Sequence, residues 1–462
     1  APAPTPAGRM ARTTALLLVA AALSAAEATA EAAPPAQVVC RTQWQPEPSD
    51  AAEHAFNAPT AGAQVSWRVI PTTPASPHPK GDAQVAYELE IHSGAASSTP
   101  VWSSGKVESA EQTLALPEAA GLKPDSTYEW RVRVWLQSKP SAPTGWGCYG
   151  GAPFDTAPAA SAFPGSARWL GGGGQMRAKS GLKLPAGTIA RARAYVTGMG
   201  AFYLFVNGQR VGINVMDPPQ TVYSKTILYN TFDVGELLTA GEVNHVGALL
   251  GNYKWGYTDQ WVNMTKGGGP DGVRALLMTL RVTMADGSVH TVSTDDASAW
   301  ECRTGPVLWD HFFHGETYDG SLDPEWNGTG TANAFPEAHA QSWRPATVIA
   351  PSATAPTGMQ VIGPDGVAVA MGAVKPMVSP PLRVTGEFPA LSATPVVAAD
   401  VGPARVFDFG QNMAGMVRLL LPAQHGIPKG TVLRIEHAEI IQGKQLDIET
   451  VSTATVCPHA VV

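Results

Sequence analysis

The alternation of apolar and polar residues predicts that the chain folds mainly as β-strands. Residues 84–91 read Gln-Val-Ala-Tyr-Glu-Leu-Glu-Ile, and Tyr128, Trp130 and Val132 recur at every second position. A period of two places alternate side chains on one face, as in a strand with one buried face. Residues 192–206 follow the same rule with β-branched and aromatic residues, which are enriched in strands.

Turn-forming dipeptides separate these runs and predict antiparallel pairing. Asn207-Gly208 follows the run 192–206, and an apolar strand is expected at 245–250. Asn-Gly is the pair best suited to a tight hairpin with positive φ. Asp286-Gly287 marks a second strand pair. Short strands at this spacing are typical of antiparallel sandwiches whose loops carry polar and aromatic side chains.

The composition favours many short strands and excludes one class of partner. The chain has 462 residues with 47 glycines, 40 prolines and 15% charged residues, which suits strands joined by turns. About 150 residues per domain suggests three domains. The net charge of -7, without a basic block, argues against nucleic acid. The 13 tryptophans fit either sugar-stacking platforms or sandwich cores.

The first 36 residues have the features of a secretory signal peptide. Met10 is a plausible start, Arg12 supplies the positive charge, residues 16–23 form an apolar core, and residues 28–30 read Ala-Thr-Ala. The apolar run is too short to span a bilayer. A disordered Ala/Pro tail is the alternative. We expect a secreted, extracellular protein with no membrane partner after removal of the leader.

Export would permit disulfide bonds. The chain contains four cysteines without metal-ligand spacing, namely Cys40, Cys148, Cys302 and Cys457. Cys40 and Cys148 lie near the two ends of the first predicted domain, so they are the disulfide candidate, with buried free thiols as the alternative. Asn263 and Asn327 begin Asn-x-Thr sequons and are N-glycosylation candidates in a eukaryotic host.

The pattern divides the chain into a leader, two sandwiches with a linker between them, and a further β-rich domain. The predicted boundaries are 1–36, 37–157, 158–183, 184–350 and 370–462. The linker is expected because its Pro-Gly and Gly-Gly-Gly-Gly segments favour neither helix nor strand. In the first domain, the Tyr-x-Trp-x-Val-x-Val strand resembles a fibronectin type III module, which usually spaces or docks other domains.

Short motifs follow one another in order through the second domain. They are Tyr-Val-x-Gly-x-Gly from Tyr195, Val-Asn-Gly-x-x-Val-Gly from Val206, Tyr-Ser-Lys-x-Ile-Leu-Tyr from Tyr223, Leu-Gly-Asn from Leu250 and Gly-Glu-x-Tyr-Asp from Gly315. Each motif alone is weak. Their order and spacing resemble the N-terminal region of bacterial-type α-L-rhamnosidases, glycoside hydrolase family 78, in which this domain is a jelly roll.

The last predicted domain extends the resemblance. Residues 380–384 read Pro-Pro-Leu-Arg-Val, residues 407–412 read Phe-Asp-Phe-Gly-Gln-Asn, and residues 437–439 read His-Ala-Glu. In the family these motifs are similar to those of a large concanavalin-like β-sandwich just ahead of the catalytic domain. The resemblance therefore implies tandem β-sandwiches and an all-β fold for nearly the whole mature chain.

The resemblance also implies a catalytic domain that this sequence does not include. The family is similar to inverting glycosidases on an (α/α)6 barrel, whose acid and base carboxyls stand roughly 6.5–9.5 Å apart. The family's Asp-Gly-x-x-Arg-Asp-Glu type segment is absent from the sequence, and no run of paired amphipathic helices occurs. We expect no (α/α)6 barrel, no catalytic residues and a truncated last domain.

Two functions stay open on this basis. The first is the non-catalytic N-terminal part of an α-L-rhamnosidase-like hydrolase, whose parent activity is inverting hydrolysis of terminal α-L-rhamnose and whose missing partner is the catalytic domain. The second is a stand-alone secreted carbohydrate-binding or interaction protein. A third, weaker hypothesis is an enzyme using the cluster Asp310, His311, His314, Glu316 and Asp319. In one continuous alternating strand these side chains would not converge, so neither a metal site nor an acid/base pair is expected.

The resemblance implies a ligand site, because one jelly-roll module in the family binds rhamnose with a calcium ion. Such a site needs an aromatic platform and, for calcium, six to eight oxygen ligands. The carbohydrate-binding candidates are Asp217, Tyr223, Asn252, Trp255, Tyr257 and Asp259. The calcium candidates are Asn214, Asp217 and Asn252. The expected partner is a rhamnose-containing glycan or glycoside, although Tyr-Lys-Trp follows Asn252 where the family usually has Gly-Trp-Tyr.

Overall fold

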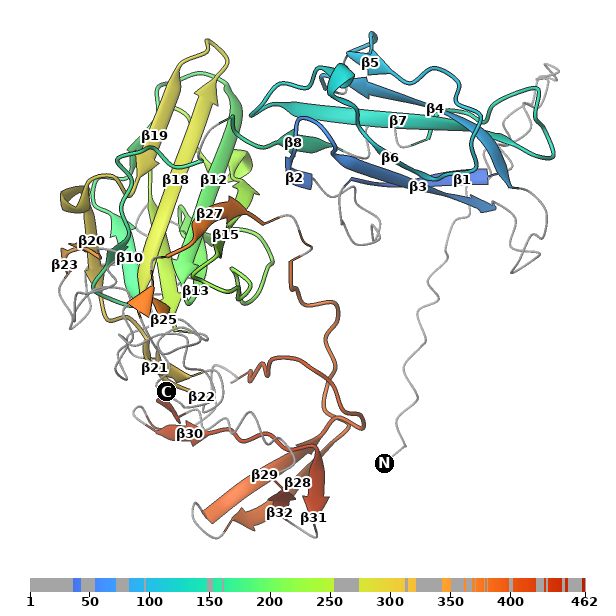
Figure 1. Cartoon of the computed structure of the whole chain (residues 1–462). Helices are drawn as coiled ribbons and strands as arrows, with labels where there is room; N and C mark the ends of the chain where they lie inside the picture. Colours follow the sequence, from blue (N-terminus) through green and yellow to red (C-terminus); the bar gives the residue numbers. More distant parts are fainter. Residues whose placement is uncertain are drawn as a thin grey trace, which may run out of the picture.

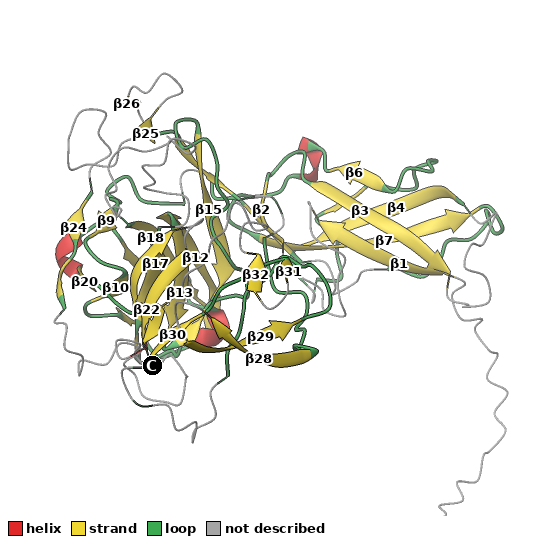
Figure 2. Cartoon of the chain, turned by 90° about the horizontal axis from the view of Figure 1, so that it is seen from below, coloured by secondary structure: helices red, strands yellow, loops and turns green. Residues whose placement is uncertain are grey.

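The computed structural model contains almost only β-structure, as the alternation predicts (Figure 1). It describes residues 36–42, 55–71, 83–94, 97–147, 153–159, 162–252, 274–311, 315–320, 343–349, 361–362, 368–369, 371–377, 379, 381–398, 402–420, 428, 431–442, 445–447 and 459–461. Among these, the helices are the 3-10 turns Glu118–Ala120, Gly235–Leu237 and Ala297–Ala299 (Figure 2). None of the described helices is long and apolar enough to cross a membrane.

The first sandwich packs a sheet ordered β1-β3-β6 against one ordered β2-β8-β7-β4-β5. Trp130 and Val132 of β7 are buried in its core, which confirms the face that the alternation predicts. Trp67 of β3 meets Trp130 edge-on at 6.4 Å between ring centroids. The strands are β1 (Ala36–Thr42), β2 (Ala55–Ala58), β3 (Gln64–Pro71), β4 (Gln84–His92), β5 (Trp102–Ser103), β6 (Thr113–Ala115), β7 (Thr127–Leu136) and β8 (Phe154–Thr156).

The second sandwich encloses the largest described core between sheets ordered β14-β13-β17-β10-β20-β23 and β24-β9-β18-β12-β15-β27. Its strands are β9 (Leu170–Gly171), β10 (Gln175–Ala178), β11 (Leu182–Lys183), β12 (Ile189–Met199), β13 (Ala201–Val206), β14 (Gln209–Arg210), β15 (Thr226–Asp233), β16 (Val243–Asn244), β17 (Val246–Gly251), β18 (Ala275–Met284), β19 (Val289–Ser293), β20 (Trp300–Arg303), β23 (Arg344–Pro345), β24 (Thr347–Val348) and β27 (Ala373–Pro376).

The expected Asn-Gly hairpin joins β13 to β14. Asn207 and Gly208 have φ of 49 and 78, and Val206 pairs with Gln209 across the turn. Two successive positive φ angles are what a type I′ turn requires. The Asn207 side chain also accepts from the backbone N–H of His245 at 2.8 Å, so the turn is bonded to the residue just before β17.

The segment 158–183, expected to be a linker, instead contributes β9, β10 and β11 to the second sandwich. Its glycines allow close backbone approach. A Cβ added at Gly173 would lie 2.2 Å from the carbonyl oxygen of Arg303, and one at Gly174 would lie 2.4 Å from that of Thr304. The glycine run therefore reflects packing at the sheet end, which composition alone does not distinguish from flexibility.

The remaining strands form smaller sheets at the end of the chain. In Figure 1 β28, β29, β31 and β32 make a small group separate from the two large sandwiches. β27 joins this region to the second sandwich, because it pairs in parallel with β15, with Ala373 opposite Thr226. The strands are β21 (Val307–His311), β22 (Gly315–Asp319), β25 (Val361–Ile362), β26 (Ala368–Val369), β28 (Ser392–Ala398), β29 (Gly402–Asp408), β30 (Val432–Arg434), β31 (Ile440–Gln442), β32 (Gln445–Asp447) and β33 (His459–Val461).

Candidate functional site

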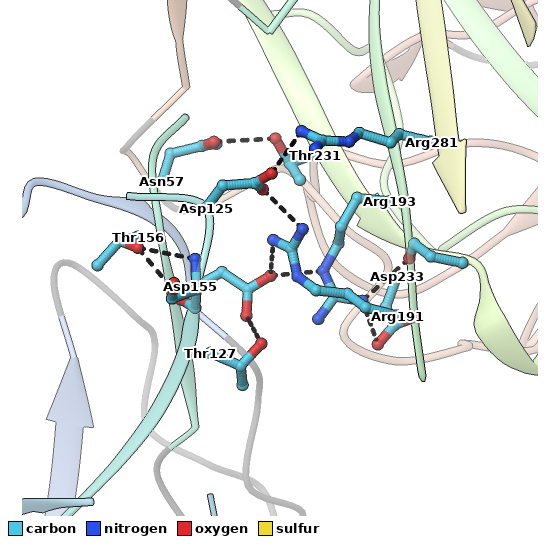
Figure 3. Close-up of polar contacts among 12 residues, drawn as sticks. Asn57, Asp125, Thr127, Asp155, Thr156, Arg191, Arg193, Thr231, Asp233 and Arg281 are labelled. Carbon is cyan, nitrogen blue, oxygen red and sulfur yellow. Dashed lines mark hydrogen bonds and ion pairs between the residues drawn. The ribbon is translucent and has the colours of Figure 1, made fainter. Parts of the chain in front are cut away.

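A cluster of ion pairs connects the first sandwich to the second (Figure 3). Asp155 of β8 is 2% exposed. Its Oδ2 forms ion pairs with Arg193 Nε at 2.5 Å and with Arg191 Nη2 at 2.8 Å, both from β12. Its other carboxylate oxygen accepts from the hydroxyl of Thr127 at 2.7 Å. One buried carboxylate therefore holds two guanidinium groups from the neighbouring domain.

Asp125 extends the cluster from the turn before β7. It binds Arg191 Nη1 at 2.6 Å and Arg281 Nη1 at 2.6 Å, and it accepts from the Tyr195 hydroxyl at 3.0 Å. Burial first, and then the charge of Asp125, raise the pKa of Tyr195 to about 12, so its phenol stays protonated and donates. Three arginines face Asp125, Asp155 and Asp233, which balances the charge within the interdomain cluster.

A second polar group surrounds Asp217, one of the predicted ligand residues. The Asp217 side chain is 3% exposed, and its Oδ2 accepts from Asn214 Nδ2 at 2.7 Å and from Asn230 Nδ2 at 2.8 Å. Burial raises the pKa of Asp217 to about 6, although the two amides and the charge of Arg210 oppose the shift. This arrangement brings the predicted calcium candidates Asn214 and Asp217 together with Asn230, which the sequence did not single out.

The segment that leads to β28 closes over this group. The N–H of Val215 donates to the carbonyl of Leu382 at 2.8 Å, and Asn230 Nδ2 also lies 3.3 Å from the sulfur of Met377. Asp217 is therefore buried near the segment that contains Met377 and Leu382. A sugar could reach its carboxylate only if this segment moved.

Asn252, the third calcium candidate, lies in a different set of contacts. Its N–H donates to Asp310 Oδ2 at 2.5 Å, and its side-chain oxygen accepts from Arg274 Nε at 3.3 Å. Arg274 Nη2 pairs with Asp310 Oδ1 at 2.8 Å. Asn252 therefore joins β17 to β21, and the three calcium candidates do not form one described site.

The other predicted residues have different outcomes. Tyr223 is buried in a core cluster with Phe163 and Tyr229. Trp255, Tyr257 and Asp259, the sequon residues Asn263 and Asn327, and Cys148 lie outside the described residues, so the aromatic platform and the disulfide stay predictions. Cys302 is a buried free thiol.

The acidic cluster near Glu316 folds as a hairpin and not as one strand. Asp310 of β21 lies opposite Glu316 of β22. Desolvation and then the charge of Asp310 raise the pKa of Glu316. The prediction that these side chains do not converge assumed one continuous strand. It was wrong for Asp310 and Glu316, which lie opposite each other across the hairpin. The described residues contain no group of three or more His, Cys, Asp or Glu side chains placed to hold a metal ion.

Two arginines contact one tryptophan ring, a feature that the sequence pattern did not indicate. The guanidinium carbons of Arg177 and Arg303 lie 4.3 Å and 4.5 Å from the ring centroid of Trp343. Arg303 is buried and donates to Gln175 at 2.6 Å. Burial and then the charge of Arg177 lower the pKa of Arg303 to about 10. Both arginines therefore make cation-π contacts with the Trp343 ring, which attaches this tryptophan to β10 and β20.

Family models match three segments of the chain in sequence order. The Rha78A-like N-terminal immunoglobulin domain matches residues 51–147, the alpha-L-rhamnosidase N-terminal domain matches 187–360, and the bacterial alpha-L-rhamnosidase concanavalin-like domain matches 401–457. These segments correspond to the first sandwich, the second sandwich and the small terminal sheets.

Curated relatives carry the same description over longer chains. An alpha-L-rhamnosidase of Formosa agariphila is 26% identical over 391 residues, which are 75% of this chain and 36% of the relative. One of Alteromonas sp. is 25% identical over 400 residues, covering 82% of this chain and 38% of the relative. The chain thus spans less than half the length of these curated relatives.

Solved structures support the fold. The alpha-L-rhamnosidase from Dictyoglomus thermophilum has a TM-score of 0.63 at 23% identity, over 88% of this chain and 43% of that one. The Streptomyces avermitilis alpha-L-rhamnosidase complexed with L-rhamnose has a TM-score of 0.60 at 19% identity, over 92% of this chain and 53% of that one. At these identities the likeness establishes the arrangement of sandwiches.

Asp155 tests the interdomain cluster. We expect Asp155→Ala to destabilise the chain by about 3–5 kcal/mol, because it leaves the buried Arg193 and the partly buried Arg191 without their shared carboxylate. Asp233→Ala is the matched control: it removes a half-exposed partner of Arg193 and should cost less than about 1 kcal/mol. Urea unfolding in low and high salt measures both, and equal costs would contradict a buried role for Asp155.

Asp217 tests the buried polar group through pH. Its pKa of about 6 lies above its ordinary 3.8, so the native state loses stability as pH rises through this window. Relative to the unchanged protein, Asp217→Asn should gain about 2 kcal/mol between pH 4 and pH 7. In the exposed control Asp286→Asn the trend should have the opposite sign, because hydrogen bonds from Ser288 lower the pKa of Asp286. The free energy of unfolding is measured at pH 4 and pH 7. If the difference between Asp217→Asn and the unchanged protein is the same at both pH values, the raised pKa of Asp217 is refuted.

Proposed function

Because three matched modules identify the chain as the N-terminal region of an α-L-rhamnosidase of glycoside hydrolase family 78, we propose that it is the non-catalytic part of such an enzyme. The observation that carries this proposal is the order of the matches, immunoglobulin-like, N-terminal and concanavalin-like, over 51–457. In this role the chain supplies architecture, and the parent activity is the inverting hydrolysis of terminal α-L-rhamnose.

The chemistry of the described acidic residues supports a structural role. Asp125 and Asp155 form ion pairs with arginines of the second sandwich, and Asp310 pairs with Arg274 while it accepts from the N–H of Asn252. A general base must keep a carboxylate accessible to a water molecule. Carboxylates already engaged by arginine and backbone donors are poorly suited to that task, so we assign them to folding.

The proposed substrate and partner follow from the relatives. One relative was solved with L-rhamnose, and we infer that a rhamnose-bearing glycan or glycoside is the ligand of the parent enzyme. The partner of this chain would be the catalytic domain. With the leader removed, the chain would work outside the cell.

A rate measurement tests the non-catalytic role. The purified chain should release no more phenol from an aryl α-L-rhamnoside than buffer does, because it would lack a positioned acid and base. Glu316→Ala is the informative variant, since Glu316 has a raised pKa and lies opposite Asp310. Turnover that survives purification and disappears in Glu316→Ala would replace our proposal with an enzyme using the β21–β22 hairpin.

A second candidate function is stand-alone carbohydrate binding by the second sandwich. The observation that favours it is a group of side chains carrying oxygen atoms that could bind calcium: Asn214 and Asn230 both contact Asp217. Carboxylate and amide oxygens suit calcium, although here Asp217 already accepts from two amides. The other residues proposed for sugar binding are Asn252, Trp255, Tyr257 and Asp259, with Trp255 as the stacking platform; Asn252 belongs to the separate contacts with Asp310 and Arg274.

Titration with L-rhamnose, with and without calcium, tests this candidate. If the loops bind sugar, Trp255→Ala should weaken binding by about tenfold or more, because stacking on an aromatic face would be lost. Asp217→Asn should remove only the calcium-dependent part. Isothermal calorimetry reports both effects. If titration of the unchanged protein with rhamnose gives no heat of binding with or without calcium, the site is eliminated.

A further inference from the structure

The turn between β13 and β14 contains two residues that can react with each other. In an Asn-Gly pair the glycine backbone nitrogen can attack the asparagine side-chain carbonyl carbon, because glycine has no Cβ to shield that nitrogen. In Asn207-Gly208 this attack joins the Gly208 nitrogen to Cγ of Asn207 and closes a succinimide ring. Nδ2 leaves as ammonia with the proton from Gly208, and water then opens the ring to aspartate or isoaspartate.

The folded chain holds the Asn207 amide at both ends. Nδ2 donates to the carbonyl of Leu237 at 2.8 Å and to Oδ1 of Asn244 at 2.9 Å. Oδ1 accepts from the backbone N–H of His245 at 2.8 Å. A carbonyl carbon under attack becomes tetrahedral, so ring closure would pull the amide out of the plane that these three hydrogen bonds require. The native contacts of Asn207 therefore oppose the reaction.

Asn244 fixes which atom position 207 must present. It is fully buried, and its Oδ1 also accepts from the N–H of Thr239 at 2.7 Å while its Nδ2 donates to the carbonyl of Thr239 at 3.0 Å. Exchanging the oxygen and nitrogen of this amide would set donor against donor, so Asn244 keeps an acceptor toward Asn207. A carboxylate at position 207 would place oxygen against this acceptor and against the carbonyl of Leu237.

We propose that Asn207 is a modification site controlled by folding: the intact second sandwich suppresses succinimide formation, and opening of the β13–β14 corner permits it. Local openings of a native protein expose such groups for a small fraction of the time. After conversion, position 207 no longer donates to its two acceptors, and buried polar groups without a partner are costly. Opening of this corner thereby becomes irreversible through a covalent change, a property that goes beyond the proposed function.

Peptide mapping by mass spectrometry tests the protection. The full chain, produced in bacteria, is incubated in mildly alkaline buffer with and without urea. We expect Asn207 to convert at least about thirtyfold more slowly without urea, because only chains with this corner open can react. Asn327-Gly328 has the same dipeptide and is the reference in urea, where both sites should convert at similar rates. Equal rates at Asn207 in the two conditions, or conversion in urea at Asn327 alone, would overturn the proposal.

A variant tests the consequence of conversion. Asn207→Asp makes one product directly and should lower the ratio of folded to unfolded chains by about tenfold to a hundredfold, because two acceptors lose their donor. Gln209→Glu is the matched control: it makes the same amide-to-carboxylate change at an exposed position of the same turn and should alter the ratio by no more than about twofold. Equal stability of the two variants would contradict the proposal.

Refolding covers the case in which Asn207→Asp does not fold. Unchanged chains are held in urea until part of Asn207 has converted, and the urea is then diluted. The chains that regain the native state should be depleted of aspartate and isoaspartate at position 207. If converted and unconverted chains regain it equally, the claim of irreversibility fails.

Discussion

The carboxylate of Asp155 is the constraint on which the arrangement of the sandwiches depends. It is almost fully buried and shared by Arg191 and Arg193, so neither sandwich can leave the other without exposing or orphaning charge. Buried pairs gain little net stability compared with apolar packing, but they are costly to break singly and they fix geometry. We therefore regard the interdomain cluster as a device for orientation. A chain that supplies architecture to an enzyme requires that orientation more than it requires extra stability.

The second sandwich is the centre of this arrangement because each neighbour is attached to it differently. The first sandwich is held by charge, through β12 and β18, while the terminal region is joined by backbone pairing between β27 and β15. Gly372 allows this pairing, since a Cβ there would lie 2.1 Å from the carbonyl carbon of Lys225. Asp217 lies beneath the same connection, which explains why a residue in a polar loop became buried.

Much of the fold could be predicted from local pattern, and much of the candidate site could not. Alternation gave the buried face of β7, and Asn207-Gly208 gave the β13–β14 turn, because both depend on neighbouring residues. The pairing of Arg191 with Asp125 joins residues 66 positions apart, and no local period encodes it. The glycines at 171–174 led to the wrong prediction of a linker. Glycine occurs both in flexible segments and where backbones pack closely, so the sequence alone does not distinguish the two. The Asp310–Glu316 pairing was missed because the hairpin between them carries no strong turn signal.

A distance distribution between the first two sandwiches tests the account most directly. Spin labels at the exposed positions Ser98 and Ala285 would report, by pulsed dipolar spectroscopy, how the first sandwich sits on the second. We predict one narrow distribution, unchanged in high salt, because buried pairs are screened little by added ions. A broad distribution in the unchanged protein, or one that widens with salt, would contradict a fixed arrangement held by Asp155.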